Sequence, residues 1–296
     1  MDFTPPENQA IFDVFPEITT LDFMAKGGFK AVYKTEIGGN SEAFKLVCLP
    51  PEGTTAEEKA YRKESLGRIQ RETALLGQCV SPQIVKLGSI PPRIVDIKGT
   101  EYIGYTEELL DGRNLWELLR AKGPKPDENE AKQLLRSLLI AIRELWGFKA
   151  IHRDIKPGNI IKLSNSNRPF VLLDLGIAYS LVDGGLTRDP GIVMATGRYF
   201  APEMIKVDFR QNLDYRSDLY TAALTIFEYC SQAHPLAKTW DDPIRTLSRA
   251  INQTPRSLKL DRPDFSDEFC ELIDKFLKKT PALRPANLGA LISELE

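Results

Sequence analysis

The stretch that decides the fold of this chain is His152-Arg153-Asp154-Ile155-Lys156-Pro157-Gly158-Asn159. It places a carboxylate, a cation two residues later and a carboxamide five residues later around a Pro-Gly turn. An apolar run follows, and a second apolar run ends in Asp174. Asp and Asn oxygens are ligands that Mg²⁺ prefers, so this arrangement predicts a site for a divalent metal and a phosphate group. A single His-x-Asp triplet is more often a chance surface loop, but eight adjacent residues with a downstream acid favour a functional interpretation.

Composition and charge limit the classes of protein. The chain has 296 residues, 42% of them hydrophobic and 27% charged, which is typical of a soluble globular protein with one large domain or two lobes. The net charge is −2 without a basic block, so we expect neither nucleic acid nor an anionic membrane as a partner. No apolar run is long enough to cross a bilayer, and residues 1–7 lack the features of a signal peptide.

The cysteines indicate the redox compartment. Four of them are spread through the chain without a CxxC pair, and there are only two histidines. This spacing excludes a zinc cluster and favours reduced, buried thiols, so the expected location is the cytoplasm.

The first third of the chain is rich in short β-like runs. Residues 1–17 suggest an extended arm, and glycines break residues 18–49 into two hairpins. The charged segment 50–67 is expected to be a loop with at most one helical turn. Residues 68–79 have helical periodicity, with Glu72 on an otherwise apolar face, and a buried carboxylate requires a partner.

Beyond a connector at 106–112 the pattern becomes helical. Capping signals predict helices that begin at Asn114 and at Pro126, and Ser217-Asp218 begins a helix that is apolar almost all round. The remainder consists of amphipathic helices separated by prolines. The expected fold class is therefore α+β, with a small lobe built on an antiparallel sheet and a larger, mainly helical lobe.

Taken together, these motifs resemble the signature set of the protein kinases. The resemblance rests on the opening stretch, on Asp174-Leu175-Gly176, on Ala201-Pro202-Glu203 and on Lys45 with Glu72, in the family's order over roughly residues 18–296. It implies the bilobal kinase fold, with an N-terminal arm at 1–17, an N-lobe at 18–108 and a C-lobe at 109–296. It also implies ATP and Mg²⁺ or Mn²⁺ as cofactors.

The resemblance assigns roles within the catalytic stretch. Asp154 would accept or orient the proton of the substrate hydroxyl, and Lys156 would neutralise the transferring phosphate. A lysine at this position is similar to that of serine/threonine kinases. Asn159 and Asp174 would hold the metal ion across the phosphates.

On the N-lobe, Lys45 would grip the phosphates and pair with Glu72; alone, such a lysine is as often a solvated strand residue. The glycine-rich loop departs from the family pattern, because Ala25 and Lys30 stand where the family has glycine. The other nucleotide-binding positions implied are the lid residues Gly27, Gly28 and Phe29, the adenine slot of Val32, Ala43 and Ile161, and the hinge backbone from Glu108 to Leu110. The gatekeeper is either Thr106 or Glu107, and the sequence leaves this open.

The resemblance extends to the activation segment and its supports. Thr196 would shape the peptide site, and Thr187 is a candidate phosphorylation site, with a solvated loop threonine as the plainer interpretation. Glu203 would pair with Arg284, and Asp218 would anchor the catalytic loop. Both roles are structural.

The sequence thus indicates a serine/threonine protein kinase that acts on protein substrates and on itself. The arm at 1–17 and the segment 50–67 are where a regulator or a second copy would bind. One alternative is a binding module with the kinase fold and little activity, which the degenerate glycine-rich loop favours. The other is a small-molecule phosphotransferase, which usually lacks the Ala-Pro-Glu segment.

Overall fold

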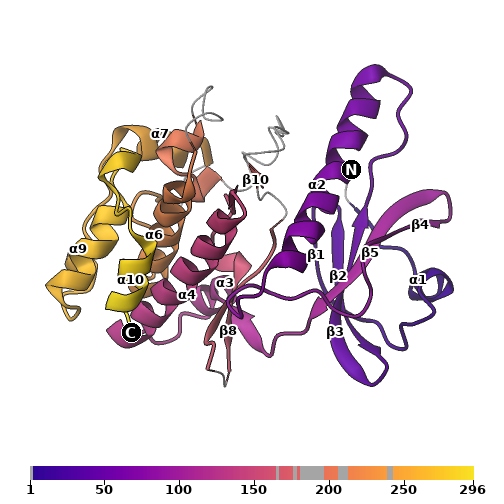
Figure 1. The fold of residues 1–296 in the computed structure, drawn as a ribbon, viewed down its shortest axis with the longest axis horizontal. Helices are drawn as coiled ribbons and strands as arrows, with labels where there is room; N and C mark the ends of the chain where they lie inside the picture. Colours follow the sequence, from indigo (N-terminus) through magenta and orange to yellow (C-terminus); the bar gives the residue numbers. More distant parts are fainter. Residues whose placement is uncertain (1–2, 165–166, 176–178, 181–196, 206–212, 239–242) are drawn as a thin grey trace. The chain divides into compact units, whose positions relative to one another are not determined.

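The computed structural model describes residues 3–164, 167–175, 179–180, 197–205, 213–238 and 243–296 (Figure 1). The chain divides into two compact units. The first comprises Met1–Cys79 and Val85–Leu110, and the second comprises Val80–Ile84 and Asp111–Glu296.

The first unit is built on a five-stranded antiparallel sheet in the order β1-β2-β3-β5-β4. Its strands are β1 (Asp22–Gly27), β2 (Lys30–Ile37), β3 (Asn40–Cys48), β4 (Arg93–Ile97) and β5 (Thr100–Glu108). Tight turns join β1 to β2, β2 to β3 and β4 to β5, and each contains a glycine with positive φ, such as Gly28 at 55°. The expected antiparallel sheet is confirmed.

One face of this sheet packs against the N-terminal segment. Residues 1–17 were expected to be extended, but Asn8–Val14 form a helix, α1, which lies beside β4 (Figure 1). Phe15 is fully buried and meets the ring of Phe44 edge-on, with 4.9 Å between the ring centroids. Its ring occupies the space above Gly104, where an added Cβ would lie 2.2 Å from the Phe15 ring. The segment is therefore part of the unit's own core.

The opposite face packs against α2 (Ala56–Gln78), a helix of 23 residues. The expected loop at 50–67 is wrong from Ala56 onward. The Thr55 hydroxyl accepts the Glu58 amide and the Glu58 carboxylate accepts the Thr55 amide, which makes a capping box. The first turns are exposed and charged, so they lack the apolar periodicity on which the prediction rested.

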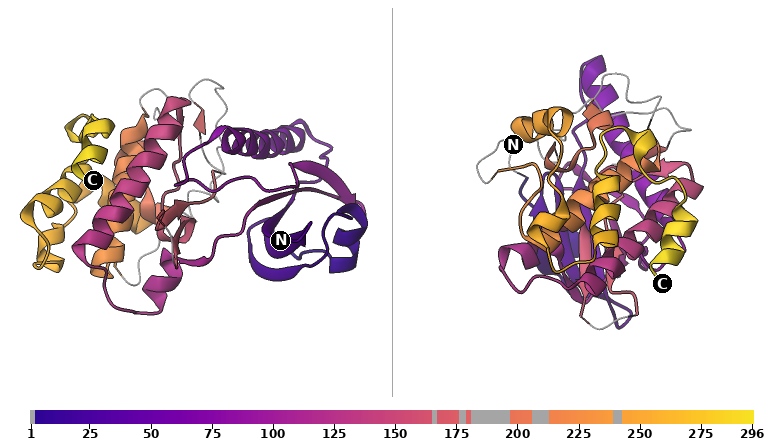
Figure 2. Two further views of the ribbon diagram at one scale, coloured as in Figure 1. Left: turned by 60° about the horizontal axis from the view of Figure 1, so that its bottom comes forward. Right: turned by 90° about the vertical axis from the view of Figure 1, so that its left-hand side faces the viewer.

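The second unit is mainly helical, as expected (Figure 2). Its helices are α3 (Leu115–Arg120), α4 (Glu128–Gly147), α6 (Tyr215–Ser231), α7 (Pro243–Asn252), α8 (Leu258–Asp261), α9 (Asp267–Phe276) and α10 (Leu288–Glu294). Helices α4 and α6 pack against each other, and α10 and α9 pack on α4 and α6 respectively. α6 is buried at every residue except Arg216, which agrees with its largely apolar sequence. Of the helices that the structure describes, none is both long and apolar enough to cross a bilayer.

Short strands in the second unit flank the stretch 152–159. The stretch begins after β7 (Ala150–Ile151), which pairs with β10 (Tyr179–Ser180). It ends in a 3₁₀ turn, Pro157–Asn159, that leads into β8 (Ile160–Leu163). β8 lies between β6 (Gly112–Asn114) and β9 (Phe170–Leu172) in a three-stranded sheet. Asp174 follows β9 by two residues, so this sheet brings both apolar runs of the sequence together.

Candidate active site

The centre of the site is the carboxylate of Asp154. Lys156 Nζ donates to Asp154 Oδ2 over 2.7 Å, and Asn159 Nδ2 donates to the same oxygen over 2.8 Å. Asn159 Nδ2 also lies 2.9 Å from the backbone carbonyl oxygen of Asp154. The Pro-Gly turn makes these contacts possible, because it folds Asn159 back onto a residue five positions earlier. The structure thus brings together three residues that the sequence placed in one site.

The second carboxylate oxygen of Asp154 is in a different state. Oδ1 is buried and has no hydrogen-bond partner among the described residues. Burial raises the pKa of Asp154, the cation of Lys156 opposes this, and the charge of Asp174 adds to it. A buried carboxylate with one oxygen held and the other unused is suited to accept a hydrogen bond or a proton from a bound molecule.

Asp218 holds the backbone of this stretch. Its Oδ2 accepts the amide of His152 over 2.7 Å, and its Oδ1 accepts the amide of Arg153 over 2.8 Å. Arg153 has a φ of 67°, in the left-handed region that a residue with a side chain rarely adopts. Burial raises the pKa of Asp218 to about 6, while the two amide hydrogen bonds act in the opposite direction. The arrangement gives Asp218 the contacts of an anchor.

His152 connects the loop to the strand that carries Asp174, and sequence reasoning missed this role. Its Nδ1 accepts the amide of Asp154 over 3.2 Å, so Nε2 carries the proton and donates to the carbonyl oxygen of Leu173 over 3.1 Å. Burial lowers the pKa of His152 to about 4, which keeps the ring neutral. The only sequence signal was its position directly after a buried strand.

Asp174 directly follows Leu173, the residue that His152 contacts. The amide of Leu173 donates to the carbonyl oxygen of Asn159 over 2.8 Å, which joins the two strand ends. Asp174 has a φ of 61° and is close enough to Asp154 and His152 to act on the pKa of both. Gly176 lies outside the described residues.

The donor set fits a metal ion that arrives with phosphate oxygens. Within the described ranges no group of three or more His, Cys, Asp or Glu residues could hold a metal ion. Asn159 uses its amide nitrogen on Asp154, so Oδ1 is the ligand that it could offer, and Asp174 adds a carboxylate. One or two protein ligands suffice for Mg²⁺ when a nucleotide supplies the other oxygens.

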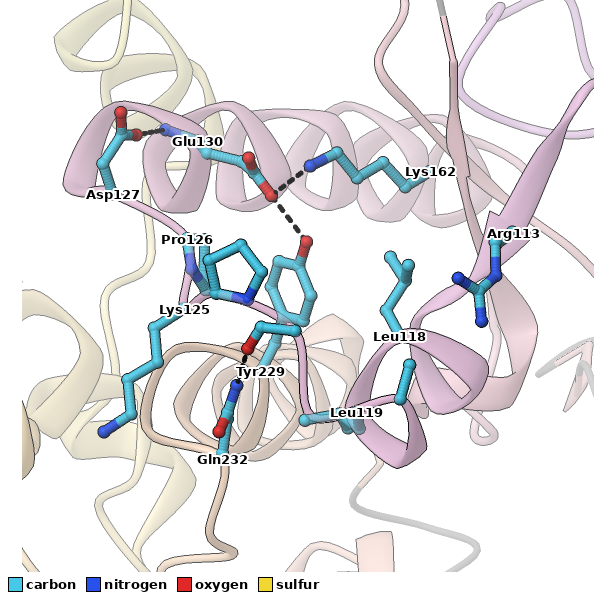
Figure 3. A pocket seen from close by; sticks show the side chains of 13 residues that line it. Arg113, Leu118, Leu119, Lys125, Pro126, Asp127, Glu130, Lys162, Tyr229 and Gln232 are labelled. Atoms are coloured by element: carbon cyan, nitrogen blue, oxygen red, sulfur yellow. Dashed lines mark hydrogen bonds and ion pairs between the residues drawn. The ribbon is translucent and has the colours of Figure 1, made fainter.

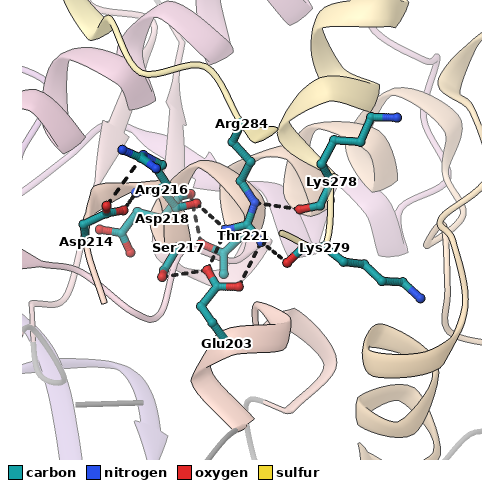
Figure 4. A network of polar contacts seen from close by, with 9 residues as sticks. All are labelled: Glu203, Asp214, Arg216, Ser217, Asp218, Thr221, Lys278, Lys279 and Arg284. Carbon is teal, nitrogen blue, oxygen red and sulfur yellow. Dashed lines mark hydrogen bonds and ion pairs between the residues drawn. The ribbon is translucent and has the colours of Figure 1, made fainter. Parts of the chain in front are cut away.

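Glu203 and Arg284 form a bidentate ion pair, with 2.5 Å from Nη1 to Oε1 and 2.9 Å from Nη2 to Oε2 (Figure 4). Ser217 Oγ also donates to Oε1, over 2.8 Å. Arg284 further donates to the backbone carbonyl oxygens of Arg216, Lys278 and Lys279. The guanidinium is therefore buried with its hydrogen bonds satisfied. The sequence indicated Ser217 only as the start of a helix and not as a partner of Glu203.

In the first unit, Lys45 forms an ion pair with Glu107. The distance from Nζ to Oε1 is 2.6 Å, and both residues are buried. Strand register places Glu107 opposite Ala43 and Tyr105 opposite Lys45, so these side chains share one face of the sheet. Thr106 belongs to the other face, where its Oγ1 accepts the amide of Ile90. Of the two gatekeeper candidates, Glu107 therefore lies on the face of Lys45. Glu72 is also buried, on α2, and its pairing with Lys45 stays a prediction.

The remaining predicted nucleotide-binding residues are divided between the two units. Ala25 pairs with Val32 across β1 and β2, Gly27 ends β1 opposite Lys30, and Gly28 and Phe29 form the turn between them. At the tip of this turn the side chain of Phe29 is exposed. The amide of Glu108 donates to the carbonyl oxygen of Lys86. Leu110 ends the first unit, whereas Ile161 belongs to β8 of the second. Thr187 and Thr196 lie outside the described residues.

A separate pocket of about 460 Å³ lies in the second unit, between the end of α3, residues 123–126 and the end of α6 (Figure 3). Its wall contains Glu130, whose Oε1 accepts Lys162 Nζ over 2.6 Å and Tyr229 Oη over 2.5 Å. These groups satisfy one another and connect α4, β8 and α6. The lining does not include the stretch 152–159.

With this geometry established, known families provide a direct comparison. Residues 23–294 match the family model of the protein kinase domain. The chain belongs to the protein kinase family. Its relatives include the serine/threonine-protein kinase pkn3 of Myxococcus xanthus, 31% identical over 64% of this chain and 35% of that protein. PknD of Mycobacterium tuberculosis is 27% identical over 92% of this chain and 38% of its own length.

Another relative, the serine/threonine-protein kinase fray2 of Dictyostelium discoideum, is 27% identical over 84% of this chain and 23% of its own length. The chain thus spans well under half of each of these relatives. Among solved structures, the PknI kinase domain of Mycobacterium tuberculosis superposes with a TM-score of 0.63 over 94% of both chains, at 19% identity. This confirms the kinase fold.

Proposed function

We propose that the chain transfers the γ-phosphate of ATP to serine and threonine hydroxyls of protein substrates, and to itself. The observation that carries this proposal is the state of Asp154. One of its oxygens is held by Lys156 and Asn159, and the other is buried and unused by the described residues. A substrate hydroxyl that donates to Oδ1 would satisfy that oxygen and be oriented for attack.

Each catalytic residue then has a physical role. Asp154 orients the hydroxyl and accepts its proton at Oδ1, a contribution of about 10² to 10⁴-fold to the rate. The ammonium group of Lys156, 2.7 Å from Oδ2, neutralises charge on the transferring phosphate. Asn159 and Asp174 would hold Mg²⁺ or Mn²⁺, and the bound metal and ATP supply charge neutralisation and the phosphoryl group. Lys156 and the names of the relatives support serine and threonine as acceptors.

The first unit would bind the nucleotide. Lys45 grips the phosphates beneath a lid formed by Ala25 to Phe29. Val32 and Ala43 would cover adenine together with Ile161, and the backbone from Glu108 to Leu110 would bond its edge. In the activation segment, Thr196 would shape the peptide site and Thr187 would take a phosphate.

A catalytically weak binding module is the second candidate, and the lid is the observation that favours it. Only Gly27 and Gly28 are glycines there, and lid glycines let backbone amides approach phosphates closely. This candidate transfers little or no phosphate.

A labelling assay decides between these functions. The chain is incubated with labelled ATP, Mg²⁺ or Mn²⁺ and generic protein acceptors, and mass spectrometry locates the phosphate. We expect phosphate on serine and threonine of the acceptors and on Thr187, and a loss of about 10² to 10⁴-fold in Asp154→Asn. The matched control, Glu268→Gln, changes an exposed carboxylate on α9 and keeps the activity. Nucleotide binding without any transfer would favour the binding module. Transfer to a panel of small alcohols and aminoglycosides, but not to protein, would favour a small-molecule phosphotransferase.

A further inference from the structure

Glu107 places a carboxylate beside Lys45, the lysine that binds the nucleotide phosphates in the proposed function. We propose that Glu107 is a positioning residue for Lys45, fixed by the sheet, so that the placement of the ammonium group does not depend on α2 alone. The inference rests on the proposed function only in assigning Lys45 to the phosphates of the nucleotide.

The contact is direct and buried. Lys45 Nζ lies 2.6 Å from Glu107 Oε1, and the exposed fractions of the two residues are 6% and 3%. The same ammonium lies 5.8 Å from the centre of the Tyr105 ring, the residue opposite Lys45 on β5. Two neighbours from one strand therefore hold the lysine on this face of the sheet.

Burial makes this pair persistent. A carboxylate or an ammonium removed from water is strongly destabilised unless it is paired, so neither group can leave the other without a replacement. An ammonium has three N–H donors. A lysine that bonds Glu107 can therefore also bond a phosphate oxygen and a second carboxylate.

The two carboxylates proposed to hold Lys45 lie on different kinds of secondary structure, one on a strand and one on a helix. Glu107 lies on β5, which pairs with β3 along its length. The pairing runs from Glu42 opposite Glu108 to Cys48 opposite Tyr102. Register therefore fixes its distance from Lys45. Glu72 lies on α2, which is attached to the sheet through side chains only: Leu66 and Ile69 pack against it, and Arg62 forms an ion pair with Glu101 of β5. A helix held by packing can shift without breaking backbone hydrogen bonds, whereas a strand within a sheet cannot.

The consequence is that charge at position 107 strengthens the binding of phosphates but not that of adenine. Replacement of Glu107 by glutamine keeps the size of the side chain and removes the charge. The ammonium then loses its fixed anchor, and nucleotides with phosphates bind less tightly. Adenosine, which has no phosphate, reports whether the rest of the nucleotide site is intact.

The experiment compares the dissociation constants of ADP and adenosine, measured by calorimetry, for the full chain and its variants. In Glu107→Gln we expect the affinity for ADP to fall about tenfold, the size expected for losing a hydrogen bond to a charged group, with adenosine unchanged. Glu107→Asp keeps the charge and should recover part of the loss. The double variant with Glu72→Gln should lose more than the product of the two single effects, because either carboxylate can hold Lys45 in part.

Glu42→Gln is the matched control. Glu42 is a buried carboxylate on β3 that faces away from Lys45 and accepts the amide of Ser89. This variant should lower the melting temperature and leave the ratio of ADP to adenosine affinity unchanged. Lys45→Ala is the reference, because it should weaken ADP but not adenosine.

Three results would overturn the inference. ADP affinity in Glu107→Gln could be unchanged or tighter, ADP and adenosine could weaken equally, or Glu72→Gln alone could abolish the preference for ADP. Failure of the proposed function has a different signature, since the wild type would then bind ADP and transfer no phosphate. The comparison of ADP with adenosine would still decide the role of Glu107 in that case.

Discussion

The surroundings of Asp154 and those of Lys45 are organised in opposite ways. Lys156, Asn159 and His152 contact Asp154 from within five residues of it along the chain. Lys45 is held by Glu107, which is 62 residues away on a neighbouring strand. A site made of local contacts can be recognised in a sequence as one motif. A site made across strands depends on register, and a shift of one residue moves the side chain to the other face.

Arg284 and Glu203 are the second unit's counterpart to the pair of Lys45 and Glu107, since they join positions 81 residues apart. Arg284→Ala leaves the buried carboxylate of Glu203 with only the Ser217 hydroxyl as a donor and removes the guanidinium from three carbonyl groups. We therefore expect a loss of about 3–5 kcal/mol in the free energy of unfolding, measured by chemical denaturation. Lys278→Ala is the control, because only the backbone of Lys278 contacts Arg284. A loss below about 1 kcal/mol, the size typical of exposed pairs, would show that this pair does not stabilise the second unit.

Low pH should destabilise the second unit, because both histidines of the chain, His152 and His234, are buried there. Burial lowers the pKa of His234 to about 3, and its Nδ1 accepts the amides of Leu236 and Ala237. At this residue the folded chain therefore binds fewer protons than the unfolded chain. The contribution of His234 to stability is fully present above pH 6.5 and is lost progressively as the pH falls toward 3.

The variant His234→Gln measures this effect by difference. Its deficit in unfolding free energy relative to the wild type should be about 2 kcal/mol smaller at pH 5 than at pH 8, because only the wild type loses the contribution of the neutral ring. Denaturant titrations at both values check the change. A deficit that is independent of pH would mean that His234 titrates normally in the folded chain.

The smallest expected effect concerns α2 and sharpens the contrast between helix and strand in the first unit. Thr55→Ala removes the side chain that caps this helix and should cost about 1 kcal/mol. Hydrogen exchange should become faster in the first turns of α2 and stay the same in β3 and β5. Thr54→Ala is a matched control. It also removes a threonine hydroxyl near Glu58, at 3.4 Å, but not the hydroxyl that accepts the Glu58 amide. Equal acceleration in the strands would show that α2 and the sheet open together.

These contrasts explain how far the sequence predicted the structure. The antiparallel sheet, the buried helix α6 and the cluster around Asp154 followed from periodicity and from one motif. The start of α2 was missed because its capped first turns carry charged residues and have no apolar stripe that would indicate a helix. The gatekeeper could not be chosen between Thr106 and Glu107, because only strand pairing decides which of the two shares a face with Lys45. His152 was missed because its role depends on a hydrogen bond to Leu173, 21 residues away, which the sequence does not show.

The packing of Phe15 over Gly104 affects where this domain can be cut. The match to the kinase family begins at residue 23, so it leaves out α1 and Phe15. A chain trimmed to that boundary would lose the aromatic ring that covers Phe44 and would open an apolar surface on the sheet. Such a fragment should be prone to aggregation even though every family motif is intact. Expression of a soluble domain therefore requires a start before Asn8, which is a boundary set by packing and not by homology.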